Sequence, residues 1–169
     1  MPDYIFNTTA LSNFAAVNRL DLLANRYRGR AFTTVEVGDE LRRGLNAGYI
    51  YLEAAWQQLE TINPAGWLRL SNPESAEEHR WRAEFGELLD PGEASCLALA
   101  ISRQLTFVTD DLAARRLAQS HQVPLTGTVG ILIALVRQAS LPLDEANAIL
   151  SIMIERRYRA PIDRLDDLI

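Results

Sequence analysis

Apolar and polar residues follow one another along the chain in a pattern that predicts strands and helices in turn. The short apolar run at residues 4–6 is typical of a strand, and after Thr9 apolar residues recur at helical spacing. Further strands are predicted at residues 31–33, 67–70, 105–109 and 124–126. Helices are predicted at residues 11–17, 20–28, 35–44, 49–59, 74–82, 90–101, 112–118, 127–139 and 143–157.

Local signals refine some of these elements. Thr33 or Thr34 is suited to cap the helix at residues 35–44, and Gly44 is suited to end it. The helix at residues 74–82 is so rich in charge that we expect it on the surface.

A helix after almost every strand predicts an α/β fold, in which a central parallel sheet is covered by helices on both faces. We expect residues 1–169 to form one such domain, because the chain has the length of an ordinary domain and shows no repeat or linker. Folds of this kind place their ligands beyond the carboxyl ends of the strands. Residues directly after strands and in first helical turns are therefore the candidates for function.

Composition excludes several classes of site. The single cysteine, Cys96, cannot form an internal disulfide, and with only His79 and His121 no Cys/His cage for zinc can form. The cysteine usage predicts a reducing, cytoplasmic compartment. The longest apolar run, at residues 131–136, is too short to span a bilayer, so we expect no membrane association. We expect Cys96 to be a small buried hydrophobe and neither histidine to be catalytic.

All 17 basic residues are arginine, and the chain contains no lysine. This excludes a Walker phosphate loop and a Schiff-base enzyme, since both require a lysine. The formal net charge of −5 argues against coating nucleic acid without regard to sequence, which needs many cationic contacts. A local basic patch remains compatible with this composition.

Acidic residues gather where the fold predicts a ligand site. Glu36 and Glu40 lie four residues apart on one predicted helix, Glu93 lies in the first turn of another, and Asp110 and Asp111 follow a strand. Carboxylates that meet in one cleft repel one another and take up protons or bind a hard cation such as Mg²⁺ or Mn²⁺. Such an ion can activate water for attack on a phosphodiester.

Each of these residues also has a purely structural explanation. Glu93 and Asp111 lie at predicted helix N-termini, where acids are favoured as caps and by the helix dipole. Glu36 and Glu40 could form a solvated face beside Arg42 and Arg43. The turn at residues 7–9 is equally suited to cap a helix.

The same stretches resemble the PIN-domain family of small α/β nucleases, which is common among bacterial toxins of the VapBC type. The resemblance covers nearly the whole chain in order, and is closest to a subfamily known only as uncharacterised or nucleic acid-binding proteins. The matching stretches lie at residues 7–11, 19–23, 35–44, 91–94, 107–111, 114–116, 127–130 and 153–159.

The resemblance implies a PIN-like, Rossmann-like three-layer α/β/α domain that hydrolyses RNA with Mg²⁺ or Mn²⁺. Glu40, Glu93 and Asp111 would hold the metal, and Asp110, which also fits the position of the fourth acid, would assist. Asn7 stands where the wider family has its first aspartate, and an amide brings an oxygen but no charge. This departure lowers the metal affinity that we expect.

The resemblance also suggests residues and partners for RNA binding. Thr8 and Thr9 match hydroxyls beside the first acid, and the arginine pairs at residues 42–43 and 115–116 are candidates to hold phosphates. These candidates are Arg42, Arg43, Arg115 and Arg116. We expect RNA, a small antitoxin protein and a second copy of the chain as partners.

The alternative is a non-catalytic nucleic acid-binding or protein-interaction module that kept the fold without an aspartate at position 7. The helices at residues 129–136 and 143–157 would then dimerise or capture a partner helix, or would simply complete the core.

Overall fold

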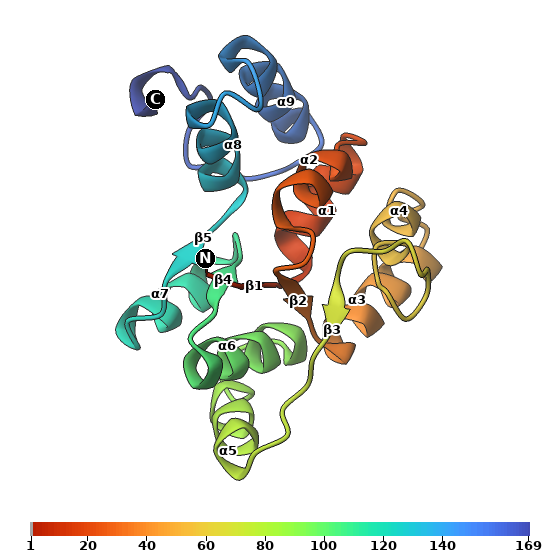
Figure 1. Cartoon of the computed structure of the whole chain (residues 1–169), viewed down its shortest axis with the longest axis vertical. Coiled ribbons are helices and arrows are strands. Elements are labelled where there is room, and N and C mark those ends of the chain that lie inside the picture. The colour runs from red at the N-terminus through yellow and green to blue at the C-terminus, as the bar shows by residue number, and fades with distance from the viewer. Residues whose placement is uncertain (1) are drawn as a thin grey trace.

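The computed structural model describes residues 2–169 and has a five-stranded parallel sheet at its centre (Figure 1). The strands lie in the order β3-β2-β1-β4-β5. Their bounds are β1 Tyr4–Phe6, β2 Ala31–Thr33, β3 Arg69–Leu70, β4 Thr106–Val108 and β5 Leu125–Thr126. The predicted α/β class with a central parallel sheet is confirmed.

Helices cover both faces of this sheet. Four helices lie on one side of it: α1 Thr8–Ala16, α2 Leu20–Tyr27, α8 Thr128–Arg137 and α9 Leu143–Glu155 (Figure 1). The other side carries α5 Ala76–Phe85, α6 Pro91–Arg103 and α7 Leu112–Ser120. Beside β3 lie α3 Val35–Asn46 and the short α4 Leu52–Trp56, and the 3₁₀ turn Asp166–Leu168 ends the chain.

Several predicted boundaries are wrong by a few residues. Gly44 does not end α3, which continues to Asn46. A Cβ at Gly44 would lie 2.4 Å from Leu52 Cδ1, so this glycine serves the close packing of α3 against α4. The left-handed φ of +104° that turns the chain belongs to Gly48 instead.

Two further predictions require correction. The helix expected at residues 49–59 is reduced to α4, since turns precede and follow it, and the strand expected at 67–70 is reduced to β3. The charged helix α5 begins at Ala76 behind the cap Ser75, and it is not wholly on the surface. Its Glu78 is buried because Arg103 pairs with it.

The core lies between the central strands and the flanking helices. Ile5 and Phe6 of β1 and Phe107 and Val108 of β4 are fully buried, as expected for strands covered on both faces. The predicted helices at residues 129–136 and 143–157 do contribute to this core, since Ile131 and Leu132 of α8 and Leu150 of α9 are fully buried.

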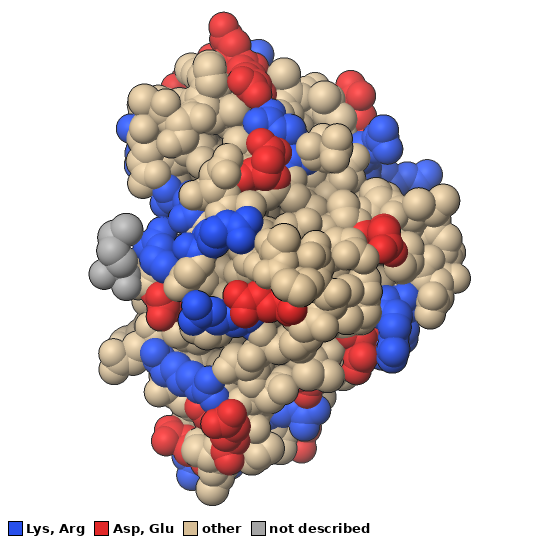
Figure 2. Space-filling model, turned by 45° about the vertical axis from the view of Figure 1, so that its right-hand side comes forward, with Lys and Arg blue, Asp and Glu red and all other residues tan. Residues whose placement is uncertain are grey.

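The described surface carries charges of both signs. On the face shown in Figure 2, arginine side chains are interspersed with Asp and Glu. No helix within residues 2–169 is long and apolar enough to cross a membrane.

Candidate active site

The candidate site lies where the chain reverses its direction of travel across the sheet. From β1 the chain proceeds through β2 to β3 on one side, and it later returns to place β4 and β5 on the other. The crevice outside the carboxyl ends of β1 and β4 is therefore the place where such sheets bind ligands. Phe6 pairs with Val108 at the end of these strands, so Asn7 and Thr109 leave the sheet side by side.

Asn7 is the buried centre of this edge. Its side-chain oxygen accepts hydrogen bonds from Thr9 N at 3.1 Å and Thr9 Oγ1 at 2.8 Å, and its Nδ2 donates to Thr109 Oγ1 at 2.6 Å. Only 1% of the residue is exposed. The amide thus caps α1 and ties β1 to β4, and both lone pairs of its oxygen are already used.

Glu40 reaches the same edge from α3. Its carboxylate accepts hydrogen bonds from Thr8 Oγ1 and from Gly92 N, the latter at 3.0 Å. A Cβ at position 92 would lie 2.5 Å from Glu40 Oε1, so only glycine allows the start of α6 to approach this carboxylate so closely. Glu40 therefore joins α1, α3 and α6 at the edge.

Glu93 and Asp111 each keep one oxygen free of protein hydrogen bonds. Glu93 Oε2 accepts from Asp90 N at 3.3 Å, and Asp111 Oδ1 accepts from Ala114 N at 2.8 Å as the cap of α7. Both capping roles considered from the sequence are thus present. The second oxygen of each carboxylate is available to a ligand.

The environment of Glu93 makes its ionisation costly. Burial raises the pKa of Glu93 to about 7, and the nearby charges of Asp111, Asp90 and Glu40 add to the effect. A partly buried carboxyl whose pKa is raised beside other carboxylates is typical of a functional site.

Asp110 has a different environment from Asp111. Its Oδ1 accepts from Thr128 N at 2.9 Å and from Tyr158 OH at 3.1 Å. Its Oδ2 accepts from Thr128 Oγ1 at 2.5 Å and from Asn13 Nδ2 at 3.2 Å. These four bonds occupy the carboxylate and hold the start of α8 against β4.

The predicted phosphate-binding arginines differ in how they are held. Arg115 donates from Nη1 to the Thr109 carbonyl at 2.8 Å, which fixes it at the end of β4. The other three, Arg42, Arg43 and Arg116, are exposed, and Arg42 also pairs with Asp39 at 3.3 Å. Glu36, expected on the face of Glu40, points instead to Arg82 of α5, with which it forms an ion pair.

The remaining side chains agree with their structural interpretation. Cys96 is fully buried, and burial raises the pKa of its thiol, so it does not act as a nucleophile. His79 is exposed, and His121 packs edge-on against Trp81 and Phe85.

The donor set suits a hard divalent cation, although the acids are not arranged as a ready-made cage. Among residues 2–169, no three Asp, Glu, His or Cys side chains lie together as a metal-binding group. Mg²⁺ is often held by one or two carboxylates together with waters and substrate phosphates. Glu93 and Asp111 are the carboxylates at this edge with an oxygen that accepts no protein hydrogen bond, so they are the candidates for this role.

Sequence reasoning missed three members of the site. Asn13, Thr128 and Tyr158 converge on Asp110 from α1, α8 and the segment after α9. Thr128 and Tyr158 lie in stretches that match the family, but nothing in the sequence assigns them or Asn13 to Asp110, because each lies far along the chain from that carboxylate. Thr109 had a signal, since it ends the predicted strand directly before the two aspartates.

Comparisons with known proteins find one matching family profile and similar solved structures. A family profile described as PIN domain matches residues 3–169. The crystal structure of PAE2754 from Pyrobaculum aerophilum is 22% identical, with a TM-score of 0.52, and covers 83% of this chain and 98% of that chain. A second crystal structure is that of VapBC2 from Rickettsia felis bound to a promoter DNA fragment. It is 17% identical with a TM-score of 0.46, and the match covers 73% of this chain and 97% of that chain. No curated protein matches the sequence.

Proposed function

This chain belongs to the PIN-domain family, and on that basis we propose that it is a divalent-metal-dependent endoribonuclease. PIN domains are generally nucleases that use divalent metal ions. The observation that carries the proposal is the acidic edge at the reversal point of the sheet. There, burial and three neighbouring carboxylates raise the pKa of Glu93 to about 7, and Glu93 and Asp111 keep oxygens free.

Glu40, Glu93 and Asp111 are the proposed metal ligands, and their side chains would have to draw together around the ion, because within residues 2–169 they do not form a ready-made metal-binding group. Glu93 and Asp111 would bind Mg²⁺ or Mn²⁺ through their free oxygens, and Glu40 through a carboxylate that Thr8 and Gly92 hold in place. When bound, the ion supplies charge to stabilise the phosphate oxygens and lowers the pKa of a water.

The other residues of the edge would hold the backbone of the site in place and bind the phosphates of the RNA. Asn7 and Asp110 assist by fixing the backbone around Thr109 and the start of α8, and Thr9 Oγ1 accepts from Asp110 N at 2.8 Å, which links these two turns. The guanidinium of Arg115 is fixed at the end of β4, where it is suited to a phosphate. Arg42, Arg43 and Arg116 are the exposed candidates for further phosphates.

A second candidate function is a binding module without catalysis. The specific observation in its favour is that the amide oxygen of Asn7 already accepts two hydrogen bonds from Thr9. A metal could not use this oxygen without displacing one of them. This candidate predicts RNA binding with no cleavage.

Our proposal includes partners. We propose that the chain acts as the toxin of a toxin–antitoxin pair in the cytoplasm, with a small antitoxin protein and a second copy of itself as partners. A short gene directly upstream that encodes a small DNA-binding protein would support this, and co-purification of its product would test it.

The deciding experiment is cleavage of end-labelled RNAs of mixed sequence with Mn²⁺ and with EDTA. The variant is Glu93→Gln, which removes the charge but keeps an oxygen to accept from Asp90 N. The matched control is Glu84→Gln, which makes the same change at an exposed position of α5.

We expect the wild type and Glu84→Gln to cleave with Mn²⁺ and to stop in EDTA, and Glu93→Gln to lose cleavage. Cleavage that survives in Glu93→Gln would contradict the proposed role of the acidic edge. A wild type that binds the RNAs but cleaves none of them with either ion would establish the binding module instead.

A further inference from the structure

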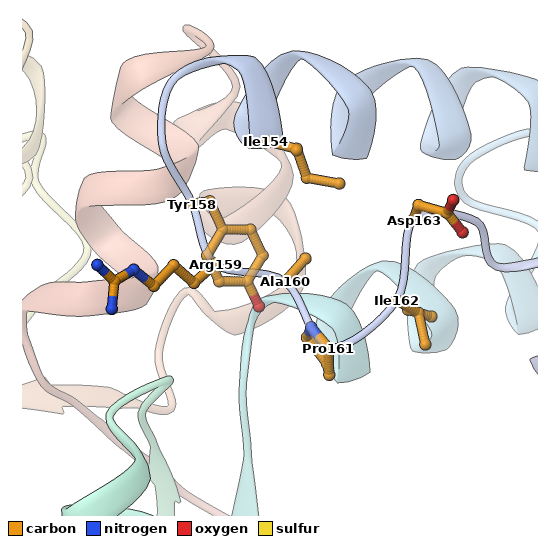
Figure 3. Close-up of a pocket in the computed structure, with 7 residues that line it drawn as sticks. All are labelled: Ile154, Tyr158, Arg159, Ala160, Pro161, Ile162 and Asp163. Atoms are coloured by element: carbon orange, nitrogen blue, oxygen red, sulfur yellow. The ribbon is translucent and has the colours of Figure 1, made fainter.

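The segment that follows α9 is fastened to the candidate active site by one side chain. Tyr158 OH donates to Asp110 Oδ1 at 3.1 Å, and Asp110 directly precedes the proposed ligand Asp111. Figure 3 shows the hydroxyl of Tyr158 directed toward the start of α8, where Thr128 binds the same carboxylate. The residues on either side of Tyr158 are therefore held close to the acidic edge.

The exposure of this segment alternates along the chain. Residues 157, 159, 161 and 163 are exposed, whereas 158, 160 and 162 are partly buried. Arg157 and Arg159 therefore face outward from the two sides of the anchored tyrosine. In Figure 3, Arg159 extends away from the hollow of about 470 Å³ that Ile154 and residues 158–163 line.

These arginines are free to bind a ligand. Arg156, Arg157 and Arg159 place three guanidinium groups within four positions, and none forms an ion pair in the described part of the chain. By contrast, Arg19 and Arg103 are both paired with acids. Unpaired guanidinium groups bind phosphate oxygens without first breaking a protein contact.

Arg115 is a further guanidinium near the anchored tyrosine, at the end of β4. Its guanidinium donates to the Thr109 carbonyl, and its Nη1 lies 3.0 Å from where a Cβ of Gly127 would be. It is close enough to Tyr158 that its charge lowers the pKa of that hydroxyl, against the larger effects of burial and Asp110. Arg115 therefore adds positive charge near the Tyr158–Asp110 contact.

We propose that Arg157 and Arg159 form a phosphate-binding arm that holds the backbone of single-stranded RNA beside the acidic edge. This inference rests on the proposed RNA nuclease and names a further part of its substrate site. A chain with a net charge of −5 needs such a local basic surface to keep RNA near its carboxylates. The Tyr158–Asp110 bond determines where the arm lies.

The test measures binding without cleavage. The parent is the full chain carrying Glu93→Gln in EDTA, and the probe is fluorescein-labelled single-stranded RNA of mixed sequence, followed by anisotropy over a range of KCl concentrations. Arg157→Gln with Arg159→Gln is compared with Arg28→Gln and Arg80→Gln. The control pair removes the same charge from the amino side of β2 and from α5.

We expect the arm variant to bind the RNA roughly tenfold more weakly. The slope of its log affinity against log salt concentration should become shallower by about 1.4, because each of the two lost phosphate contacts contributes about 0.7 to that slope. The control pair should retain both values. Arg157→Lys with Arg159→Lys should restore the salt slope, because the charges return. Circular dichroism checks that all variants fold.

Three outcomes would overturn the proposed arm. The arm variant and the control pair could lose RNA affinity equally, the arm variant could lose none, or the parent could fail to bind the RNA. The measurement is independent of catalysis. RNA binding that depends on Arg157 and Arg159, in a protein whose wild type cleaves nothing, would support the arm and overturn the proposed nuclease.

Discussion

At the scale of single residues, Glu93 couples folding to pH. Its pKa of about 7 lies above the ordinary 4.5, so the folded protein retains a proton that the unfolded chain releases. The stability that this proton confers is complete below about pH 4.5 and is lost as the pH rises through about 7.

We therefore expect the free energy of unfolding in EDTA to fall by at most about 3 kcal/mol over that range. Urea unfolding at a series of pH values measures this, and Glu93→Gln should remove the slope while Glu84→Gln keeps it. A slope that persists in Glu93→Gln would assign the effect to another group.

Asn7→Asp introduces the aspartate that the wider family has at this position, and so tests what the asparagine changes. The new oxygen would face Thr109 Oγ1 and add negative charge to a site that is 1% exposed. We expect the metal-free protein to lose about 1–3 kcal/mol of stability, because a buried charge replaces a satisfied amide. We also expect tighter Mn²⁺ binding by calorimetry.

The control for this change is Asn63→Asp, whose side chain accepts from Ala65 N and can continue to do so as a carboxylate. It should leave Mn²⁺ affinity unchanged. If Asn7→Asp also leaves the affinity unchanged, Asn7 does not lie at a metal site.

The sequence predicts well where single residues lie when short-range signals set their positions, whereas their roles in the site stay predictions. Asp111 and Glu93 follow from their positions after a strand and in a first helical turn. The difference between Asp110 and Asp111 does not follow, because it depends on Asn13, Thr128 and Tyr158, which only the folded chain brings to Asp110.

At the scale of elements, one buried ion pair joins α5 to α6. Glu78 accepts from Arg103 Nε at 2.7 Å and Nη2 at 3.1 Å, and from the backbone of Glu74 and Ser75. The hydrogen bonds from Arg103, supported by these backbone bonds, lower the pKa of Glu78 to about 2. Protonation of Glu78 therefore weakens the contact between the helices.

This stability is present above about pH 4.5 and is lost as the pH falls toward about 2. We expect Glu78→Gln to cost about 2–3 kcal/mol at neutral pH and to flatten the acid side of the stability curve. Acid titration followed by circular dichroism measures this. Equal acid sensitivity in Glu78→Gln and the exposed control Glu84→Gln would contradict it.

Elements are predicted best where periodicity is strong and short-range signals agree. The helix α6 has a proline, a first-turn acid and an apolar face, and it begins at Pro91, within one residue of the predicted start. The burial of Glu78 could not be predicted, because its charged neighbours on α5 indicate a solvated helix and Arg103 lies 25 residues away.

At the scale of the whole molecule, the order of the strands creates the site. Alternation of strands and helices predicts a parallel sheet, but it does not predict that β1 lies between β2 and β4. That arrangement places Asn7 beside Thr109 and brings the acids of α3, α6 and the turn after β4 to one edge. Periodicity alone does not indicate that these acids belong to one site. The resemblance of their positions to a family pattern does.

Residues 165–168 form a tail that packs against the helices that precede it. Leu165 is fully buried, its backbone N–H donates to Asn147 Oδ1 at 2.8 Å, and Arg137 donates to the Leu168 carbonyl at 2.7 Å. Tyr158 is bound within the proposed RNA-binding arm and Leu165 is bound beyond it, so two contacts hold this segment in place.

If the tail is part of the cooperative core, Leu165→Ala should lower the stability of the whole protein by about 2–4 kcal/mol, the cost of a cavity at a buried leucine. Tryptophan fluorescence and far-ultraviolet circular dichroism should then report one shared, lower midpoint in urea, because Trp67 is buried far along the chain from the tail. Leu168→Ala, at a residue that is 41% exposed, should change stability by less than about 0.5 kcal/mol. An unchanged midpoint in Leu165→Ala would mean that the tail detaches without unfolding the sheet, so the arm would be held by Tyr158 alone.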